Sequence, residues 1–271
     1  MKFENLEINQ PNSDLNKEDQ DYQHLDLSLL KNFKLTIAYD GTDYHGWQRQ
    51  PGQKTIQGLT EEALRKILGQ KINLQAAGRT DAGVHALGQV ANFRSDSRLT
   101  EEELLRALNT KLPFDIRILS VELASPDFQA RKSAWSKVYR YRIKISPIVS
   151  PFEYRYVFHY PYSLDLKAME QAALCFERED DFSAFSSGNY LNPLRKIFQS
   201  RLENWGDELI YTVEANGFLR SMVRTITGTL IMVGRGRLKP EEIDHLFRQK
   251  KRTLFSPTAP ARGLCLVRVN Y

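Results

Sequence analysis

The chain carries at residues 76–93 the stretch AAGRTDAGVHALGQVANF, in which a polar turn separates two strand-like segments. Its glycines, Gly78, Gly83 and Gly88, allow backbone conformations that other residues resist. Between the first two stands one carboxylate, Asp81, with Arg79 two positions before it. Such a turn can hold a catalytic acid, and the arginine offers a cation that can pair with it or bind a phosphate. For the short sequence RTD alone, an Asx turn beside a surface arginine is the simpler interpretation.

The segments on either side of this turn predict strands and helices in a definite order. Apolar patterns predict strands over 33–39, 72–77, 89–93 and 116–123. Thr55 is the expected N-cap of an amphipathic helix that ends at Gly69, and Thr100 with Glu103 forms a capping-box signature before a helix over 101–109. The order is β-α-β-β-α-β, which is typical of a ferredoxin-like antiparallel sheet with both helices on one face.

The second half of the chain nearly repeats this order. Strands are predicted over 137–145, near 197–204, over 209–215 and over 264–271, and helices over 165–176, 219–233 and 240–249. We therefore predict an α+β fold of two ferredoxin-like (βαββαβ) halves with antiparallel sheets, over residues 31–132 and 133–271. Residues 1–30 have few apolar side chains and no sustained period, so they are expected to form a disordered or loosely docked tail.

The composition limits the class of protein. With 271 residues, 41% of them hydrophobic, the chain can bury a sizeable core. No apolar run approaches the roughly 20 residues that span a bilayer, and the N-terminus does not resemble a signal sequence, so a cytoplasmic protein is expected. Cys175 and Cys265 lie in apolar patterns and indicate buried thiols, not a disulfide framework. His45 and His85 show no metal-ligand spacing, and no metal site is expected.

Charge is distributed unevenly along the chain. The formal net charge is +5, but residues 1–30 hold two lysines against seven acidic residues, a net charge of −5. Residues 31–271 therefore carry 36 basic and 26 acidic side chains, a net charge of +10. A basic body suits a polyanionic partner such as a nucleic acid, although many basic proteins bind none.

The stretch GRTDAGVHALGQV closely resembles the catalytic motif of the bacterial tRNA pseudouridine synthase A family. The resemblance implies that Asp81 is the nucleophile of an enzyme that converts uridine to pseudouridine at positions 38, 39 and/or 40 of the tRNA anticodon stem-loop. It also implies an enzyme that needs no cofactor and no metal, binds tRNA and forms a homodimer. In that family, two ferredoxin-like halves join around a central catalytic cleft.

Such an enzyme needs an aromatic wall for a base that has left its stack. In VYRYRI (138–143), Tyr139 and Tyr141 share one face of a strand, and Arg140 and Arg142 share the other. Alternation alone fits a packed core as well as a stacking surface. The resemblance implies that Tyr139 is the stacking residue, which leaves Tyr141 for the core. It also implies that Leu264, in the C-terminal stretch PTAPARGLCLVRVNY, lines the base pocket.

A cation for the acid is expected in GFLRSMVRTITGTL (217–230), where Arg220 and Arg224 lie four residues apart on a helix. Without context these are ordinary surface charges. The stretch resembles the family's FLxxMVR motif, which implies that Arg224 pairs with Asp81 and leaves Arg220 for a phosphate or for solvent.

Further residues are expected near the substrate. His85 lies inside the catalytic motif, and Trp47 and Arg49 lie in YDGTDYHGWQRQ (39–50), which also matches the family. Trp47 is interpreted equally well as a structural anchor.

Two other functions remain open from the sequence. A non-catalytic RNA-binding protein could use ferredoxin-like sheets, but the chain lacks the aromatic RNP signature of such sheets. A nucleoside glycosidase would usually need paired carboxylates, and GRTDAGVH supplies one.

Overall fold

A computed structural model describes residues 30–271 of the chain. Residues 31–271 form one compact unit. The predicted acidic tail lies outside the described residues, apart from Leu30.

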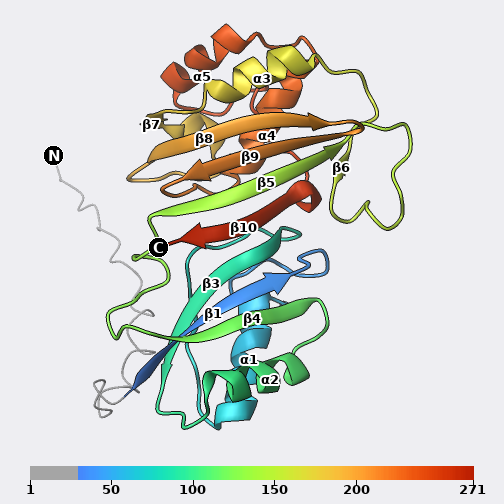
Figure 1. Cartoon of the computed structure of the whole chain (residues 1–271). Coiled ribbons are helices and arrows are strands. Elements are labelled where there is room, and N and C mark those ends of the chain that lie inside the picture. The colour runs from blue at the N-terminus through green and yellow to red at the C-terminus, as the bar shows by residue number, and fades with distance from the viewer. Residues whose placement is uncertain (1–29) are drawn as a thin grey trace, which may run out of the picture. The chain divides into compact units, whose positions relative to one another are not determined.

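The first half has the predicted ferredoxin-like order (Figure 1). Its elements are β1 (Lys31–Tyr39), α1 (Ile56–Leu68), β2 (Gln75–Ala76), β3 (His85–Ser95), α2 (Glu101–Lys111) and β4 (Ile116–Ala124). The strands lie in the order β4-β1-β3, and β2 pairs with the far edge of β3. Every one of these pairs is antiparallel.

Both predicted helix starts of this half are confirmed. The side chain of Thr55 accepts a hydrogen bond from the backbone N–H of Gly58, and Gly69 ends α1 in the left-handed conformation at φ 70°. Thr100 and Glu103 form the complete capping box of α2. These caps satisfy backbone groups that a helix end leaves without partners.

The strand predicted over 72–77 is shortened at its start to β2 at Gln75–Ala76, because helix α1 takes the backbone groups of Leu74. The carbonyl of Leu74 accepts a bond from Gln57 Nε2 at 3.2 Å, and its N–H donates to Glu61 Oε1 at 3.0 Å. The apolar alternation of this segment therefore reflects burial against α1 more than pairing in the sheet.

The second half repeats the topology of the first. Its elements are β5 (Ser136–Lys144), β6 (Phe158–His159), α3 (Leu166–Leu174), β7 (Glu179–Asp181), β8 (Leu194–Trp205), β9 (Glu208–Ala215), α4 (Met222–Gly234), α5 (Ile243–Gln249) and β10 (Leu264–Asn270), with short 3-10 helices η4 (Phe182–Phe185), η5 (Pro240–Glu242) and η6 (Ala261–Gly263). Its strands lie in the order β10-β5-β9-β8-β7, with antiparallel pairs between neighbours.

The halves join through a parallel contact between β3 and β10, which we call the seam. Cys265 lies opposite His85, and Leu266 lies opposite Ala86. A Cβ on Gly88 would lie 2.6 Å from the carbonyl oxygen of Val267, so only glycine allows the two strands to approach this closely. The seam also explains why β3 is longer than the predicted 89–93, since β10 pairs with its first residues.

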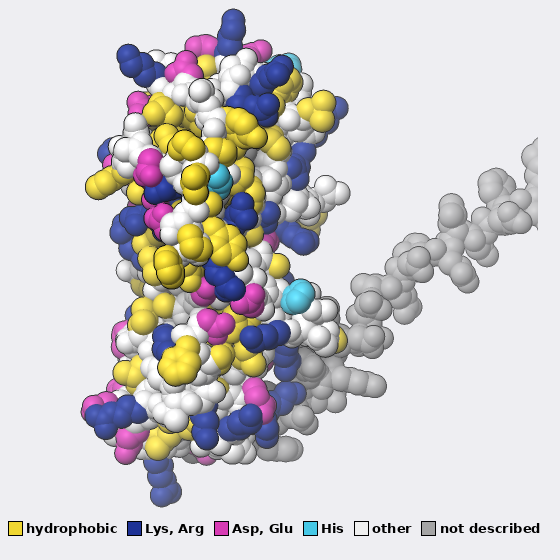
Figure 2. Space-filling model, turned by 90° about the vertical axis from the view of Figure 1, so that its right-hand side faces the viewer, with side chains coloured by type: hydrophobic (Ala, Val, Ile, Leu, Met, Phe, Trp, Pro, Cys, Tyr) yellow, Lys and Arg dark blue, Asp and Glu magenta, His cyan; other side chains and the backbone are white. Residues whose placement is uncertain are grey.

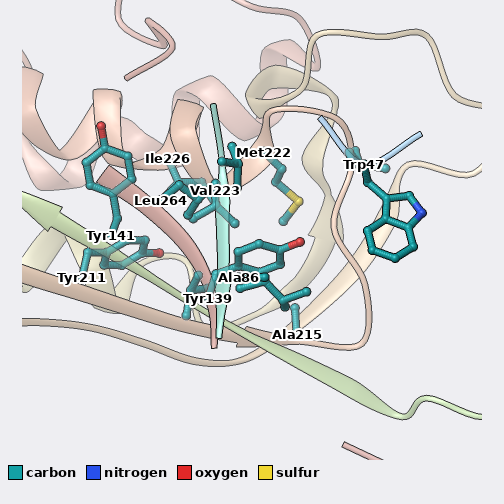
Figure 3. Close-up of a cluster of buried hydrophobic side chains, with 14 of the residues drawn as sticks. Trp47, Ala86, Tyr139, Tyr141, Tyr211, Ala215, Met222, Val223, Ile226 and Leu264 are labelled. Atoms are coloured by element: carbon teal, nitrogen blue, oxygen red, sulfur yellow. The ribbon is translucent and has the colours of Figure 1, made fainter. Parts of the chain in front are cut away.

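One hydrophobic core runs through both halves and across the seam. Figure 3 shows part of it, where Ala86 of β3 lies near Tyr139, Leu264 and residues of α4. Cys175 and Cys265 are free and half-buried, so they are less buried than predicted. No helix within residues 30–271 is long and apolar enough to cross a membrane. The exact boundary between the halves stays a prediction.

Candidate active site

The turn that carries Asp81 lies between β2 and β3, and the segment after β1 holds it in place. The N–H of Trp47 donates to the carbonyl of Thr80 at 3.1 Å, and the N–H of Gly83 donates to the carbonyl of Tyr44 at 3.3 Å. The Tyr39 hydroxyl lies 2.8 Å from Thr80 Oγ1. These bonds fix the backbone on both sides of Asp81, which is what a preorganised catalytic group requires.

Two side chains from the other half hold the Asp81 carboxylate. Arg224 Nη1 and Ser221 Oγ each donate to Asp81 Oδ2 at 3.1 Å. The side chains of Asp81 and Arg224 are 27% and 19% exposed, so the pair is partly shielded from water but open on one side. Within residues 30–271, Oδ1 accepts no hydrogen bond, which leaves one oxygen of the carboxylate available to a ligand.

Helix α4 and the C-terminal segment together fix Arg224. Its Nε donates to the carbonyl of Ala259 at 2.8 Å, and the N–H of Ala259 donates back to the carbonyl of Arg224 at 3.0 Å. A Cβ on Gly228 would lie 2.0 Å from the carbonyl oxygen of Pro257, so the glycine lets this segment lie directly on the helix. The guanidinium is therefore held by backbone contacts as well as by its ion pair with Asp81.

Ser221 is a site residue that the sequence did not indicate. It precedes α4 with φ 60° and ψ 7°, a left-handed conformation that costs a non-glycine residue about 1–2 kcal/mol. Its hydroxyl accepts a bond from Ser187 Oγ at 3.1 Å and donates to Asp81. A serine before a helix normally predicts an N-cap, but Ser221 makes no side-chain cap bond, and only the structure reveals this.

Tyr139 lies in β5 close to this pair. It is 7% exposed, and its ring packs edge-to-face on Phe218 with centroids 5.0 Å apart. Burial raises the pKa of its phenol, and the nearby charge of Asp81 adds to this effect. Figure 3 shows its ring near Met222 and Val223 of α4. The tyrosine is therefore an uncharged ring that forms an apolar wall beside Asp81.

Tyr141 and Leu264 lie deeper in the same wall. Tyr141 is fully buried, as predicted, and its hydroxyl donates to the carbonyl of Pro260 at 2.7 Å. Leu264 pairs with it across β5 and β10 and is 6% exposed. A shallow pocket of about 350 Å³ lies next to the turn that carries Asp81 and is lined by Thr42, Gly83, Pro260, Ala261 and Arg262.

His85, the first residue of β3, contacts backbone groups and the carboxylate of Asp40. Its Nδ1 lies 3.1 Å from both the backbone nitrogen of Gly41 and Oδ1 of Asp40. Its Nε2 lies 3.1 and 3.2 Å from the carbonyl oxygens of Arg155 and Arg262. Burial lowers its pKa, and nearby Asp40 partly opposes that shift. The contacts of its ring nitrogens link His85 to three other segments near the seam. Because His85 is only 6% exposed, it presents little surface to a substrate.

The remaining predicted residues divide into buried and exposed ones. Trp47 is 1% exposed, as a structural anchor would be. Arg79 and Arg220 are exposed, and neither forms an ion pair within the described part of the chain. Arg49 is exposed, with Nη1 3.6 Å from Glu61 Oε2. Among residues 30–271, no three His, Cys, Asp or Glu side chains are grouped as metal ligands.

Comparison with known proteins gives matches over most of the chain. A model of the tRNA pseudouridine synthase family matches residues 35–131 and 172–271. The chain is 46% identical over 244 residues to tRNA pseudouridine synthase A of Caldicellulosiruptor saccharolyticus, covering 89% of this chain and 100% of the relative. It is 42% identical over 254 residues to the protein of that name in Thermodesulfovibrio yellowstonii, with the same coverage. For Geobacillus sp. the identity is 41% over 246 residues, covering 90% of this chain and 99% of the relative.

Proposed function

This chain belongs to the tRNA pseudouridine synthase family, and we propose that it isomerises uridine at positions 38, 39 and/or 40 of the tRNA anticodon stem-loop with Asp81 as nucleophile. The observation that carries the proposal is the ion pair between Asp81 and Arg224, which forms between the two halves at 3.1 Å. The matched relatives are named for tRNA pseudouridine synthesis, which supports tRNA as the substrate class.

The reaction breaks the bond between C1′ of the ribose and N1 of uracil and forms a bond from C1′ to C5. The proton on C5 is lost and N1 gains one, so no atoms are exchanged overall and no electrons are needed. Asp81 supplies the nucleophile through Oδ1 while Arg224 and Ser221 hold Oδ2. Attack at C6 of the base and attack at C1′ of the ribose both use this geometry.

The target base must leave its stack to reach Asp81. Tyr139 supports this step as the ring on which the base stacks, with Leu264 as a further apolar wall of the pocket. Because the phenol of Tyr139 is uncharged and makes no hydrogen bond within residues 30–271, its contribution is the ring face. Arg220 and Arg79, which are exposed near the catalytic turn and α4, are proposed to contact backbone phosphates.

A glycosidase is less well supported. Glycoside hydrolysis usually uses two carboxylates that flank the scissile bond. The side chains that hold Asp81 are those of Arg224 and Ser221, and neither is a second carboxylate.

We further propose a cytoplasmic homodimer. Figure 2 shows hydrophobic side chains gathered among basic ones on the side where the segment between β5 and β6 lies. The exposed apolar residues of that segment are Ile148, Phe152, Tyr154 and Tyr156. Exposed apolar side chains gathered on one side are typical of an interaction surface.

The test is to incubate the purified chain with unmodified tRNA transcripts and to analyse the nucleosides and any free base released. Pseudouridine without free uracil is expected. Free uracil without pseudouridine would favour the glycosidase, and tRNA binding with neither product would favour a non-catalytic RNA-binding protein.

A further inference from the structure

Two cationic side chains, Lys137 and Arg195, lie on the face of the sheet that carries Tyr139, and a third, Arg131, lies near both. Lys137 is two residues before Tyr139 in β5, so the two side chains share a face. Lys137 lies opposite Ala215 of β9, and Ala215 lies opposite Ile197 of β8. Arg195 is two residues before Ile197 and therefore shares this face too. Arg131, from the segment between β4 and β5, is close enough to interact electrostatically with both.

This cation cluster of Arg131, Lys137 and Arg195 borders the catalytic site on two sides. A Cβ on Gly78 would lie 3.6 Å from Lys137 Cε, and Gly78 is three residues before Asp81, so their Cα atoms are at most about 11 Å apart. A Cβ on Gly217 would lie 3.5 Å from Arg195 Nε, and Gly217 directly precedes Phe218, which packs on Tyr139.

The cluster has no anionic partner within residues 30–271. None of its three members forms an ion pair there, whereas Arg142, from the other face of β5, pairs with Glu208. Lys137 is half-buried, and burial, followed by the charges of Arg131 and Arg195, lowers its pKa. Arg195 donates to the carbonyls of Asn192 and Leu194, which orients its guanidinium but adds no charge. Like charges gathered without a counter-ion are unfavourable, and a bound anion would relieve that cost.

We propose that Arg131, Lys137 and Arg195 form a phosphate-binding site that holds a backbone phosphodiester of the RNA next to the nucleotide at Asp81. This inference rests on the proposed function, because it takes RNA to be the ligand. Lysine binds a phosphate as a point charge and arginine through its planar donors. A phosphate held here keeps the ribose in place while its base leaves the stack, so the site positions the substrate and takes no part in bond making.

The test measures tRNA binding in an Asp81→Asn background, so that catalysis does not enter. We expect Lys137→Gln and Arg195→Gln each to weaken binding about tenfold, as loss of a charge-assisted hydrogen bond does. Each should also lower the slope of log affinity against log salt by about one, whereas Lys137→Arg keeps the slope. The matched control is Lys167→Gln on α3, which is exposed and has no ion pair in the described chain. Thermal melts of all variants identify any loss of folding.

The outcomes separate this inference from the proposed function. If the wild-type chain makes pseudouridine but both glutamine variants bind like the Lys167→Gln control, the phosphate site is wrong and the function stands. If the wild-type chain makes none, the function is wrong, and the salt slopes still report on the site. Calorimetry with inorganic phosphate alone tests whether the site binds a free phosphate anion instead of an RNA phosphate. We expect no saturable binding at millimolar phosphate, and saturable binding that Lys137→Gln removes would assign the site to a free anion and overturn the RNA assignment.

Discussion

The two halves have one topology but use it differently at the same position. In the first half the connection between β2 and β3 spans residues 77–84 and carries Asp81. In the second half the corresponding connection, between β8 and β9, is only Gly206 and Asp207, with Gly206 at φ 73°. A tight hairpin turn joins strands and offers no room for a site, so the longer connection is what distinguishes the half that carries Asp81.

The corresponding helices, α2 and α4, also differ in how they begin and in how deeply they are buried. Helix α2 begins with a complete capping box, and only Leu104 and Leu108 of its residues are buried. Helix α4 begins at Ser221 without a side-chain cap, and nearly all of its residues are buried. The hydroxyl that would cap α4 binds Asp81 instead. The first half therefore presents the acid and the second half holds it.

The largest effect on activity is expected from Asp81→Asn. Asparagine keeps the shape and loses the nucleophile, so pseudouridine formation should fall below detection while tRNA affinity and melting temperature stay near wild type. Single-turnover assays with excess enzyme measure the loss. Retention of a tenth of wild-type turnover would make Asp81 a structural turn residue.

Removing Arg224, the ion-pair partner of Asp81, should have the next largest effect on turnover. Arg224→Gln leaves Asp81 without its cation, and we expect turnover to fall on the order of 10²-fold, as when one preorganised donor is lost. Lys167→Gln on α3 is the control, because this exposed cation does not contact Asp81. Equal losses in both variants would argue that Arg224 acts only through general positive charge.

Two substitutions of Tyr139 distinguish the contribution of its ring from that of its hydroxyl. Tyr139→Phe should retain activity, because the hydroxyl makes no hydrogen bond in the described chain. Tyr139→Ala should lose about 1–3 kcal/mol of base stacking and also about 3–5 kcal/mol of stability from the cavity. Kinetics below the melting range of each variant distinguish the two costs. If phenylalanine and alanine behave alike in turnover, the ring is not the stacking surface.

Substitutions of Ser221 test whether its left-handed conformation before α4 supports activity through the hydrogen bond to Asp81. Ser221→Gly and Ser221→Ala both remove the bond to Asp81, so each should lower turnover about tenfold. Their melting temperatures should differ, since glycine relieves the left-handed conformation and alanine does not. A wild-type turnover in both variants would limit Ser221 to a structural role.

The smallest expected effect concerns pH and the seam. The folded chain holds His85 with a lowered pKa, so the unfolded chain binds more protons as pH falls below about 6.5. Stability should therefore be complete above that pH and decline as pH falls toward the pKa of His85 in the folded state. Melting temperatures from pH 8 to pH 5 should fall less steeply for His85→Gln. Parallel pH profiles would show that His85 is not the titrating group.

The sequence predicted those features that depend on neighbouring residues. Thr55, Thr100 and Gly69 mark helix ends through local hydrogen bonds and backbone conformation, and all three were predicted. It did not predict that Gln57 and Glu61 would take the backbone bonds of Leu74, because that contact depends on how α1 lies on the sheet.

The site residues that the sequence did not predict also depend on contacts between distant parts of the chain. The resemblance brought Asp81, Arg224 and Tyr139 together, and the structure has the first two in contact. Ser221 was missed because its left-handed backbone is set by the tertiary packing around it. The place of His85 beside the substrate stays a prediction, and the sequence did not indicate that its ring contacts Asp40 and backbone groups from distant parts of the chain.

The central claim is that an acid from one half, held by the other, isomerises uridines in the anticodon stem-loop. The most direct measurement is a nucleotide-resolution map of pseudouridine in unmodified tRNA transcripts, made by chemical adduct formation and primer extension, with wild-type chain and Asp81→Asn side by side. The account predicts stops that report positions 38, 39 and/or 40 with the wild-type chain and none with Asp81→Asn. No signal at these positions with the wild-type chain, or equal signals with both proteins, would contradict it.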